Sequence, residues 1–253
     1  MAINRYFGDS DLFITITANA KWPEIQNALL DGQEAHNHPN LVVYVFHAKL
    51  HSFIKDIKNG ILDNIAAFLY TIEFQKRGLS HAHIIIFLKP HAKLCTPDQI
   101  DSLMSSEFPI GNPELLELIK KFIVHGPCGR HNINVPYING GKCTRKFPMT
   151  FREHITITED SYARTRCSNT SQTTEVRGKH VDNRWVVCYN KYLIWKYRCH
   201  INIESIASIK AVKYIFKYVY KGHDHTTMEF GTYVDEIKQY LDSQYVGSCE
   251  ANW

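Results

Sequence analysis

The sequence lacks the features that would place it in several specialised classes of protein. No apolar run reaches the roughly 20 residues of a membrane-spanning helix, and the amino-terminus has no secretory signal pattern. The seven cysteines are odd in number and irregularly spaced, which argues against a disulfide framework. No G-x4-G-K-[ST] phosphate-binding motif is present. These absences favour an intracellular protein that works without a membrane.

The composition is that of an ordinary globular protein. The 253 residues carry a formal net charge of +4, with 44% hydrophobic and 21% charged residues. A chain of this length buries a real core, and its composition excludes extensive disorder. So mild a charge permits a nucleic-acid partner without requiring one. Fourteen histidines are more than usual and direct attention to metal or phosphate chemistry.

The most informative stretch is residues 68–89, which predicts two strands joined by a tight turn. Alternation of apolar and polar residues predicts strands at 68–76 and 80–88. Between them, Gly78 can take a positive φ and close a three-residue loop. Pairing of residues 76 and 80 would then fix the register of the hairpin.

That register places four polar side chains on one face of the hairpin. Gln75 would lie opposite His81, and Glu73 opposite His83. Two imidazoles, a carboxylate and an amide are the ligand types of a divalent-metal site. The alternative is a half-solvated sheet face that carries these residues by chance.

The remaining segments predict an α+β fold, a central antiparallel sheet flanked by helices and interrupted by a loop-rich insertion. Strands are expected at residues 11–17 and 199–204, and helices near 41–59 and 113–124. A further helix is expected to start at Pro97, with Thr96 as its cap. We expect three parts. Residues 1–95 form the first part of the core, 96–190 a helical and loop-rich insertion, and 191–253 the returning part of the core.

The insertion contains a spacing of potential zinc ligands. The pattern H-x2-C-x2-H-x11-C could supply four ligands, namely His125, Cys128, His131 and Cys143. The usual paired C-x2-C motifs are absent, so a polar loop with buried thiols is the alternative to a structural Zn²⁺.

Residues 208–221 predict an amphipathic helix that ends at Gly222. Tyr214 and Tyr218 are four residues apart and share one face, and Lys217 and Lys221 share an adjoining face. A metal site together with such a helix suggests phosphodiester cleavage by a tyrosine. Because a phenol has a pKa near 10, a metal ion and lysines would have to assist it.

Three stretches carry a resemblance to a known family: Phe13–Thr17 (FITIT), Glu73–His83 (EFQKRGLSHAH) and Lys213–Gly222 (KYIFKYVYKG). They resemble the replication-initiator (Rep) region of Helitron transposases, often labelled the Helitron helicase-like domain, in the HUH endonuclease superfamily. The resemblance extends over nearly the whole chain, at Lys21–Ile25, His125–Gly129, Asp182–Val187 and Cys199–Asn202.

The resemblance implies a role for each candidate residue. His81 and His83 match the metal-binding histidines, with Glu73 as the acidic ligand and Gln75 as its competitor. Tyr214 and Tyr218 match the paired nucleophiles, and Lys217 and Lys221 match the accompanying lysines. The implied fold has a HUH/Rep-like, ferredoxin-like core with the histidines on a central strand under the tyrosine helix.

The implied activity is nicking and joining of single-stranded DNA for rolling-circle transposition. It uses Mg²⁺ or Mn²⁺, forms a 5′-phosphotyrosine intermediate, and takes place in the nucleus. Full-length relatives continue into a helicase, which we expect to be absent here. The chain also departs from the family pattern at Ala18, Ala20, Ser80 and Pro136–Tyr137. A catalytically silent, transposon-derived DNA-binding module is therefore the alternative.

Overall fold

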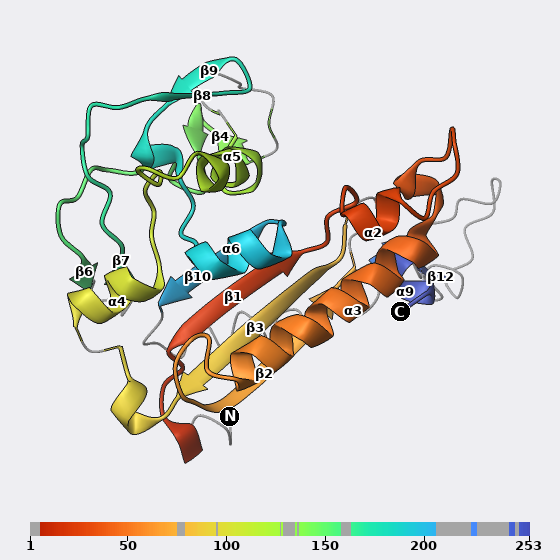
Figure 1. Cartoon of the computed structure of the whole chain (residues 1–253), viewed down its shortest axis with the longest axis horizontal. Coiled ribbons are helices and arrows are strands. Elements are labelled where there is room, and N and C mark those ends of the chain that lie inside the picture. The colour runs from red at the N-terminus through yellow and green to blue at the C-terminus, as the bar shows by residue number, and fades with distance from the viewer. Residues whose placement is uncertain are drawn as a thin grey trace, which may run out of the picture.

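In the computed structural model, an antiparallel sheet of four strands organises the chain (Figure 1). The structure describes residues 6–74, 79–94, 96–126, 128, 135, 137–157, 163–205, 224–226, 243–245 and 248–253. The order in the sheet is β10 (Ile201–Ser205), β1 (Leu12–Thr17), β3 (His81–Leu88) and β2 (Ile65–Glu73). The predicted α+β fold with an antiparallel sheet and helices is confirmed.

One face of the sheet is apolar because every second residue of its inner strands is aliphatic. On β1 these residues are Leu12, Ile14 and Ile16, and all three are completely buried. On β3, Ala82, Ile84, Ile86 and Leu88 lie on the same face. The period of two along each strand thus yields one continuous hydrophobic surface for the helices to cover.

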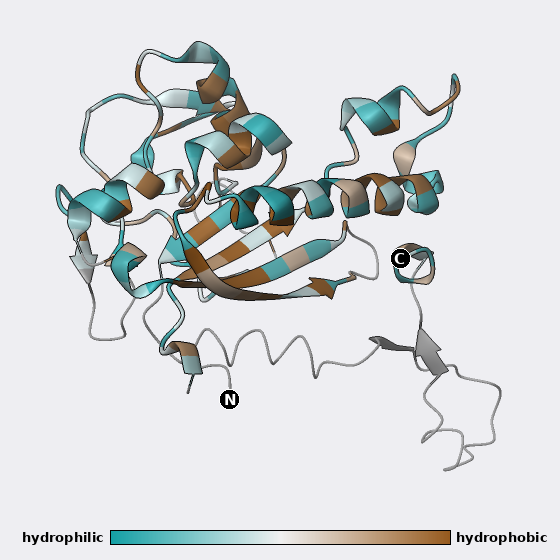
Figure 2. Cartoon of the chain, turned by 60° about the horizontal axis from the view of Figure 1, so that its bottom comes forward, coloured by the Kyte–Doolittle hydropathy of each residue, from teal (hydrophilic) through white to brown (hydrophobic). Residues whose placement is uncertain are grey.

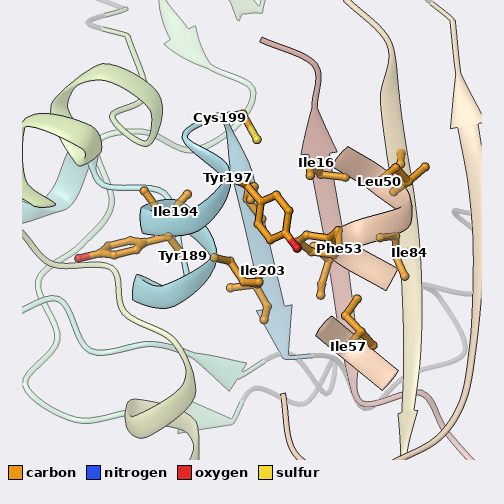
Figure 3. Packing of buried hydrophobic residues seen from close by; sticks show 14 of the residues in the cluster. Ile16, Leu50, Phe53, Ile57, Ile84, Tyr189, Ile194, Tyr197, Cys199 and Ile203 are labelled. Carbon is orange, nitrogen blue, oxygen red and sulfur yellow. The ribbon is translucent and has the colours of Figure 1, made fainter. Parts of the chain in front are cut away.

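The long helix α3 (Pro39–Lys58) covers this face. Pro39 occupies its first turn, where a missing N–H costs nothing. Figure 2 shows α3 lying along one face of the sheet. The helix buries one stripe of residues, including Leu50, Phe53 and Ile57, against the strands (Figure 3). Full burial of such a side chain stabilises the fold by about 1.5–3 kcal/mol, so this stripe is what holds α3 on the sheet.

A second helix, α6 (Lys191–Tyr197), lies beside α3 on the same face (Figure 3). The ring of Tyr197 packs edge-on against Phe53, with centroids 5.1 Å apart. Its hydroxyl donates to Asp56 at 2.5 Å, and Lys196 forms an ion pair with the same carboxylate at 2.6 Å. The short helix α2 (Pro23–Gln26) follows Trp22, whose indole N–H donates to the Tyr197 carbonyl oxygen at 2.7 Å. These contacts fasten α6 to α3 and to the segment that follows β1.

The register of the β2–β3 hairpin differs from the prediction. Glu73 pairs with His81 and Thr71 pairs with His83, so Glu73 does not lie directly opposite His83. The predicted register, with Glu73 opposite His83, is therefore wrong. The predicted pairing of residues 76 and 80 and its loop fall on residues 75–78, which lie outside the described residues. The predicted faces are right, since this two-residue change leaves every side chain on the same side of the sheet.

Between β3 and β10 the chain leaves the sheet and forms small elements beside its β10 edge (Figure 1). Helix α4 (Pro97–Leu103) has the predicted Thr96 cap, completed by Gln99 as a capping box, and α5 (Pro113–Phe122) is capped by Asn112. The short strands pair as hairpins: β4 (Ile138–Asn139) with β5 (Lys142–Cys143), β6 (Thr156–Ile157) with β7 (Ala163–Arg164), and β8 (Thr174–Val176) with β9 (Lys179–Val181). Turns of 3₁₀ helix occur at η1 (Ala35–Asn37), η2 (Pro90–Ala92) and η3 (Asn183–Trp185).

The carboxyl-terminal part of the chain is described in pieces. Strands β11 (Asp224–Thr226) and β12 (Ser243–Tyr245) pair with each other, and α9 (Ser248–Ala251) packs beside α3. Trp253 contacts the rings of Phe46 and Phe74. The helix expected at residues 208–221 lies outside the described residues. The three-part division of the chain stays a prediction.

Candidate functional site

The second face of the sheet carries polar side chains in two rows across the strands. Glu73 of β2 pairs with His81, His81 with Thr17, and the Thr17 amide donates to the carbonyl oxygen of His200 at 3.0 Å. In the next row, Thr71 pairs with His83, His83 with Thr15, and Thr15 with Asn202. Both candidate metal-binding histidines therefore lie on β3, an interior strand, and on the face that α3 leaves uncovered.

Threonines on β1 hold both imidazoles by their Nδ1 atoms. Thr17 Oγ1 lies 2.7 Å from His81 Nδ1, and Thr15 Oγ1 lies 3.1 Å from His83 Nδ1. A hydroxyl can donate or accept, so each bond orients its ring in either tautomer. Because Nδ1 is the threonine-bonded atom of both rings, Nε2 is the atom of each ring that could meet a metal ion, and imidazoles oriented in this way are typical of metal sites.

Glu73 contacts one of the two histidines directly. Its Oε2 lies 3.1 Å from His83 Nε2, and the side chains are only 15% and 6% exposed. Phe13 stacks on the His83 ring with a centroid distance of 5.9 Å and shields it further. The structure thus brings Glu73 to His83 through a diagonal contact, although its backbone partner is His81.

Burial governs the protonation of both histidines. It lowers the pKa of His81 to about 4, a shift that the Glu73 charge opposes and the charges of His83, His200 and Arg145 reinforce. Burial also lowers the pKa of His83, against the effect of Glu73. Near pH 7 both rings are therefore neutral, and the neutral imidazole is the form that binds metal ions.

The sheet residues are not drawn together into a closed cluster. The centroids of the His81 and His83 rings are 6.3 Å apart. Among the described residues, no group of three ligand atoms within 4.8 Å of one another forms at the sheet. Gln75, the competing ligand, lies outside the described residues. These residues nevertheless offer donors for a divalent cation, because the carboxylate suits Mg²⁺ or Mn²⁺ and imidazole nitrogens are ligands of transition-metal ions.

Sequence reasoning missed three residues of this face, Thr15, Thr17 and His200. His200 lies beside the row of His81, and its Nδ1 donates to the Phe122 carbonyl oxygen at 2.6 Å. Alternation on β1 signals that Thr15 and Thr17 face away from the core. Their contact with the histidines depends on which strands are neighbours, and no local pattern specifies this.

A second cluster of ligand atoms lies in the insertion. His125 Nε2 is 3.5 Å from the sulfur of Cys128 and 3.5 Å from that of Cys143. The three ligand atoms all lie within 4.8 Å of one another, the only such group among the described residues. The β4–β5 hairpin delivers Cys143 to the other two. His131, the fourth residue of the predicted set, lies outside the described residues.

The surroundings of this cluster are apolar and aromatic. Phe147 stacks on the His125 ring with centroids 4.2 Å apart, and the Trp185 ring lies nearly parallel to that of His125, with centroids 6.5 Å apart. Burial lowers the pKa of His125 to about 4 and raises the pKa of Cys128 to about 11, with Cys143 adding to the latter shift. Two thiols and a neutral imidazole in a small buried cluster fit Zn²⁺, which would displace the thiol protons on binding.

The four candidate catalytic residues of the predicted helix, Tyr214, Lys217, Tyr218 and Lys221, lie outside the described residues. The six cysteines that the structure describes are free thiols. No helix in the described part of the chain combines the length and apolarity needed to cross a bilayer.

Comparison with known families matches one region of the chain. Residues 1–86 match the family model of the Helitron helicase-like domain at the N-terminus, so this part of the chain is Helitron-related. The match spans β1, α2, α3, β2 and most of β3, and it includes Glu73, His81 and His83. It does not reach the Cys/His cluster. No curated protein matches the chain.

Proposed function

We propose, from the Helitron-related region at residues 1–86, that this chain is a metal-dependent endonuclease and strand transferase acting on single-stranded DNA in rolling-circle transposition. It would form a 5′-phosphotyrosine intermediate on a HUH/Rep-like, ferredoxin-like core in the nucleus. The observation that carries the proposal is the pair of threonine-held histidines beside Glu73, on the face of the sheet opposite α3.

The residues that would hold the metal are His81, His83 and Glu73, with Gln75 as the alternative to Glu73. The carboxylate suits Mg²⁺ or Mn²⁺, and the neutral imidazoles add nitrogen donors that transition-metal ions accept. The bound cation would supply positive charge beside a non-bridging phosphate oxygen and so stabilise the charge that develops there. Thr15 and Thr17 would keep both imidazoles oriented, and the apolar packing beneath the strand would keep His83 in place.

The nucleophile of the proposal is a tyrosine, Tyr214 or Tyr218. Its phenol oxygen would attack the phosphorus as the bond to the 3′ oxygen breaks, which leaves a 5′-phosphotyrosine and a free 3′ hydroxyl. The phenol loses one proton and the 3′ oxygen gains one. Lys217 and Lys221, spaced at helical intervals from the tyrosines, would favour the phenolate by their positive charge. The second tyrosine would allow a second strand to be cut while the first link persists.

We also propose a structural Zn²⁺ held by His125, Cys128 and Cys143. The convergence of one nitrogen and two sulfur atoms supports it. His131 is the candidate for the fourth position of a tetrahedral site. Such an ion would fasten the β4–β5 hairpin to the loop that follows α5, and so stiffen the insertion.

Covalent trapping tests the proposed activity. The chain is incubated with Mn²⁺ and a panel of single-stranded oligodeoxynucleotides of different sequence, and the products are resolved by denaturing electrophoresis. We expect a protein–DNA adduct that is absent with EDTA and absent in the double variant Tyr214→Phe, Tyr218→Phe. Tyr44→Phe, a change at an exposed tyrosine of α3, is the matched control.

Salt-dependent DNA binding with neither cleavage nor adduct in the unmodified chain would overturn the catalytic proposal. That result would instead support the silent DNA-binding module. Glu73 and His83 contact each other at 3.1 Å. This contact would favour the silent module if a metal ion could not separate the two side chains and bind between them.

A further inference from the structure

A large cavity lies between the polar face of the sheet and the insertion. Its volume is about 870 Å³, and Thr17, His81 and His200 line it on the sheet side. The loop after the β4–β5 hairpin and strand β7 line it on the other side. Because His81 belongs to both, the cavity opens onto the candidate metal site.

The charge of this cavity is strongly one-sided. Five cationic side chains line it, and Glu204 is the only carboxylate among its described lining residues. The five cations are Arg145, Lys146, Arg152, Arg164 and Arg177. Elsewhere arginines such as Arg166 and Arg198 form ion pairs, whereas none of these five pairs with a described carboxylate. Uncompensated positive charge lining one cavity favours a polyanionic ligand.

Aromatic rings and one unsatisfied acceptor accompany this charge. Phe122, Tyr137 and Phe147 line the cavity, and the Arg145 guanidinium lies 5.6 Å from the centroid of the Tyr137 ring. Asn202 also lines it. Its Oδ1 is buried and has no hydrogen-bond partner among the described residues. Cations that bind phosphates, rings that stack on bases and a polar atom for a base edge are the parts of a single-strand binding groove.

Arg145 holds the central position. It lines the cavity with His81 and His200, and its charge contributes, after burial, to lowering the pKa of both. It follows Cys143 by two residues, so the Cys/His cluster fixes the backbone that presents it. The insertion thereby extends a guanidinium toward the site on the sheet.

We propose that this basic cavity binds the sugar–phosphate backbone of the single strand that is cut at the sheet, with Arg145 and Lys146 as phosphate ligands. The inference rests on the proposed function and adds to it the path of the strand. A small anion would need only one or two of these cations. A folded protein partner could not enter the cavity, so the cationic side chains of the cavity would stay unpaired.

Binding measurements without metal test the inference independently of cleavage. Fluorescence anisotropy of a labelled oligodeoxythymidylate is followed in EDTA at several salt concentrations, with the double variant Arg145→Ala, Lys146→Ala. We expect about a tenfold or greater loss of affinity and a salt slope smaller by about 1.4, because each phosphate contact to a single strand contributes about 0.7. The control Lys55→Ala, Lys58→Ala removes the same charge from α3, on the other face of the sheet, and should change both quantities less.

Equal affinity and salt slope in the two double variants would overturn the inference. Photo-crosslinking of the unmodified chain to an iodouracil oligonucleotide keeps the test valid if the cavity variant misfolds. Crosslinks should map to residues 137–152, and crosslinks confined to α3 would also overturn the inference. Normal binding without any adduct would count against the catalytic proposal alone, whereas adduct formation with unchanged binding in the cavity variant would count against the cavity alone. Equal displacement of the oligonucleotide by inorganic phosphate, at matched phosphate concentration, would contradict a polynucleotide site.

Discussion

The sheet site and the Cys/His cluster gather similar residue types in different ways. On the sheet, His81 and His83 are spaced by the strand, with ring centroids 6.3 Å apart, and hydrogen bonds to β1 hold them. In the insertion, loops bring one imidazole and two thiols to within 4.8 Å. A strand fixes the direction of its side chains but keeps them apart, so its site stays open to a further ligand. The loops of the cluster hold their ligand atoms closer together, and a structural zinc site with four protein ligands, as proposed there, has no position for a substrate.

Removal of the sheet histidines should have the largest effect on activity. The double variant His81→Ala, His83→Ala should slow oligonucleotide cleavage about a thousandfold, because a metal ion supplies several kcal/mol of charge stabilisation in the transition state. Single-turnover cleavage with Mn²⁺ measures it. His91→Ala changes an exposed histidine and should cleave at the original rate. Equal rates in all three proteins would remove the sheet site from the mechanism.

Loss of the cluster should reduce stability more than chemistry. Cys128→Ser should lower bound zinc from about one equivalent to nearly none, as measured by mass spectrometry of the metal. The melting temperature should fall by several degrees, since each kcal/mol lost corresponds to roughly 2–4 °C in a chain of this size. Cys249→Ser, in α9, serves as the matched control. A zinc content that is unchanged by Cys128→Ser would mean that the cluster is a group of buried thiols.

Two single variants, one at Glu73 and one at Gln75, test which residue is the third ligand on the sheet. Glu73→Gln should weaken Mn²⁺ binding about tenfold or more, because it removes the negative charge that lies 3.1 Å from His83 Nε2. Gln75→Ala should weaken binding less. Titration followed by electron paramagnetic resonance compares the two, and the reverse order would assign the role to Gln75.

The threonines of β1 should have a smaller effect. Thr17→Val keeps the shape of the side chain but removes the hydroxyl that lies 2.7 Å from His81 Nδ1. We expect Mn²⁺ affinity to fall several-fold and by no more than about tenfold. Thr17→Ser keeps the hydroxyl and should bind like the original chain. Identical affinities for the valine and serine variants would show that the hydroxyl does not orient the ring.

Local sequence patterns predicted the faces of the sheet but not its lateral contacts. Alternation with a period of two placed His81, His83 and Glu73 on one side correctly, yet a shift of two residues preserves that pattern, so the register of Glu73 was wrong. The partnership of Thr15 with His83 depends on β1 lying next to β3, which only the folded sheet specifies.

The spacing of cysteines and histidines in the insertion predicted a cluster of ligand atoms, although it is not a common zinc-binding motif. His125, Cys128 and Cys143 converge although no paired C-x2-C motif marks them, because a hairpin brings Cys143 back across 15 residues. The cavity, in contrast, is lined by cationic side chains between residues 145 and 177 and by strands from both ends of the chain. No local sequence pattern brings these segments together. The net charge of +4 for the whole chain did not indicate that cationic side chains gather at this cavity.

The central claim is that the polar face of the sheet is an open metal site distinct from the closed cluster. Anomalous diffraction from crystals grown with Mn²⁺ and Zn²⁺ tests it most directly. We expect a manganese-edge peak beside the Nε2 atoms of His81 and His83 and the Glu73 carboxylate, and a zinc-edge peak among His125, Cys128 and Cys143. A zinc peak at the cluster with no manganese peak at the sheet histidines would contradict the account.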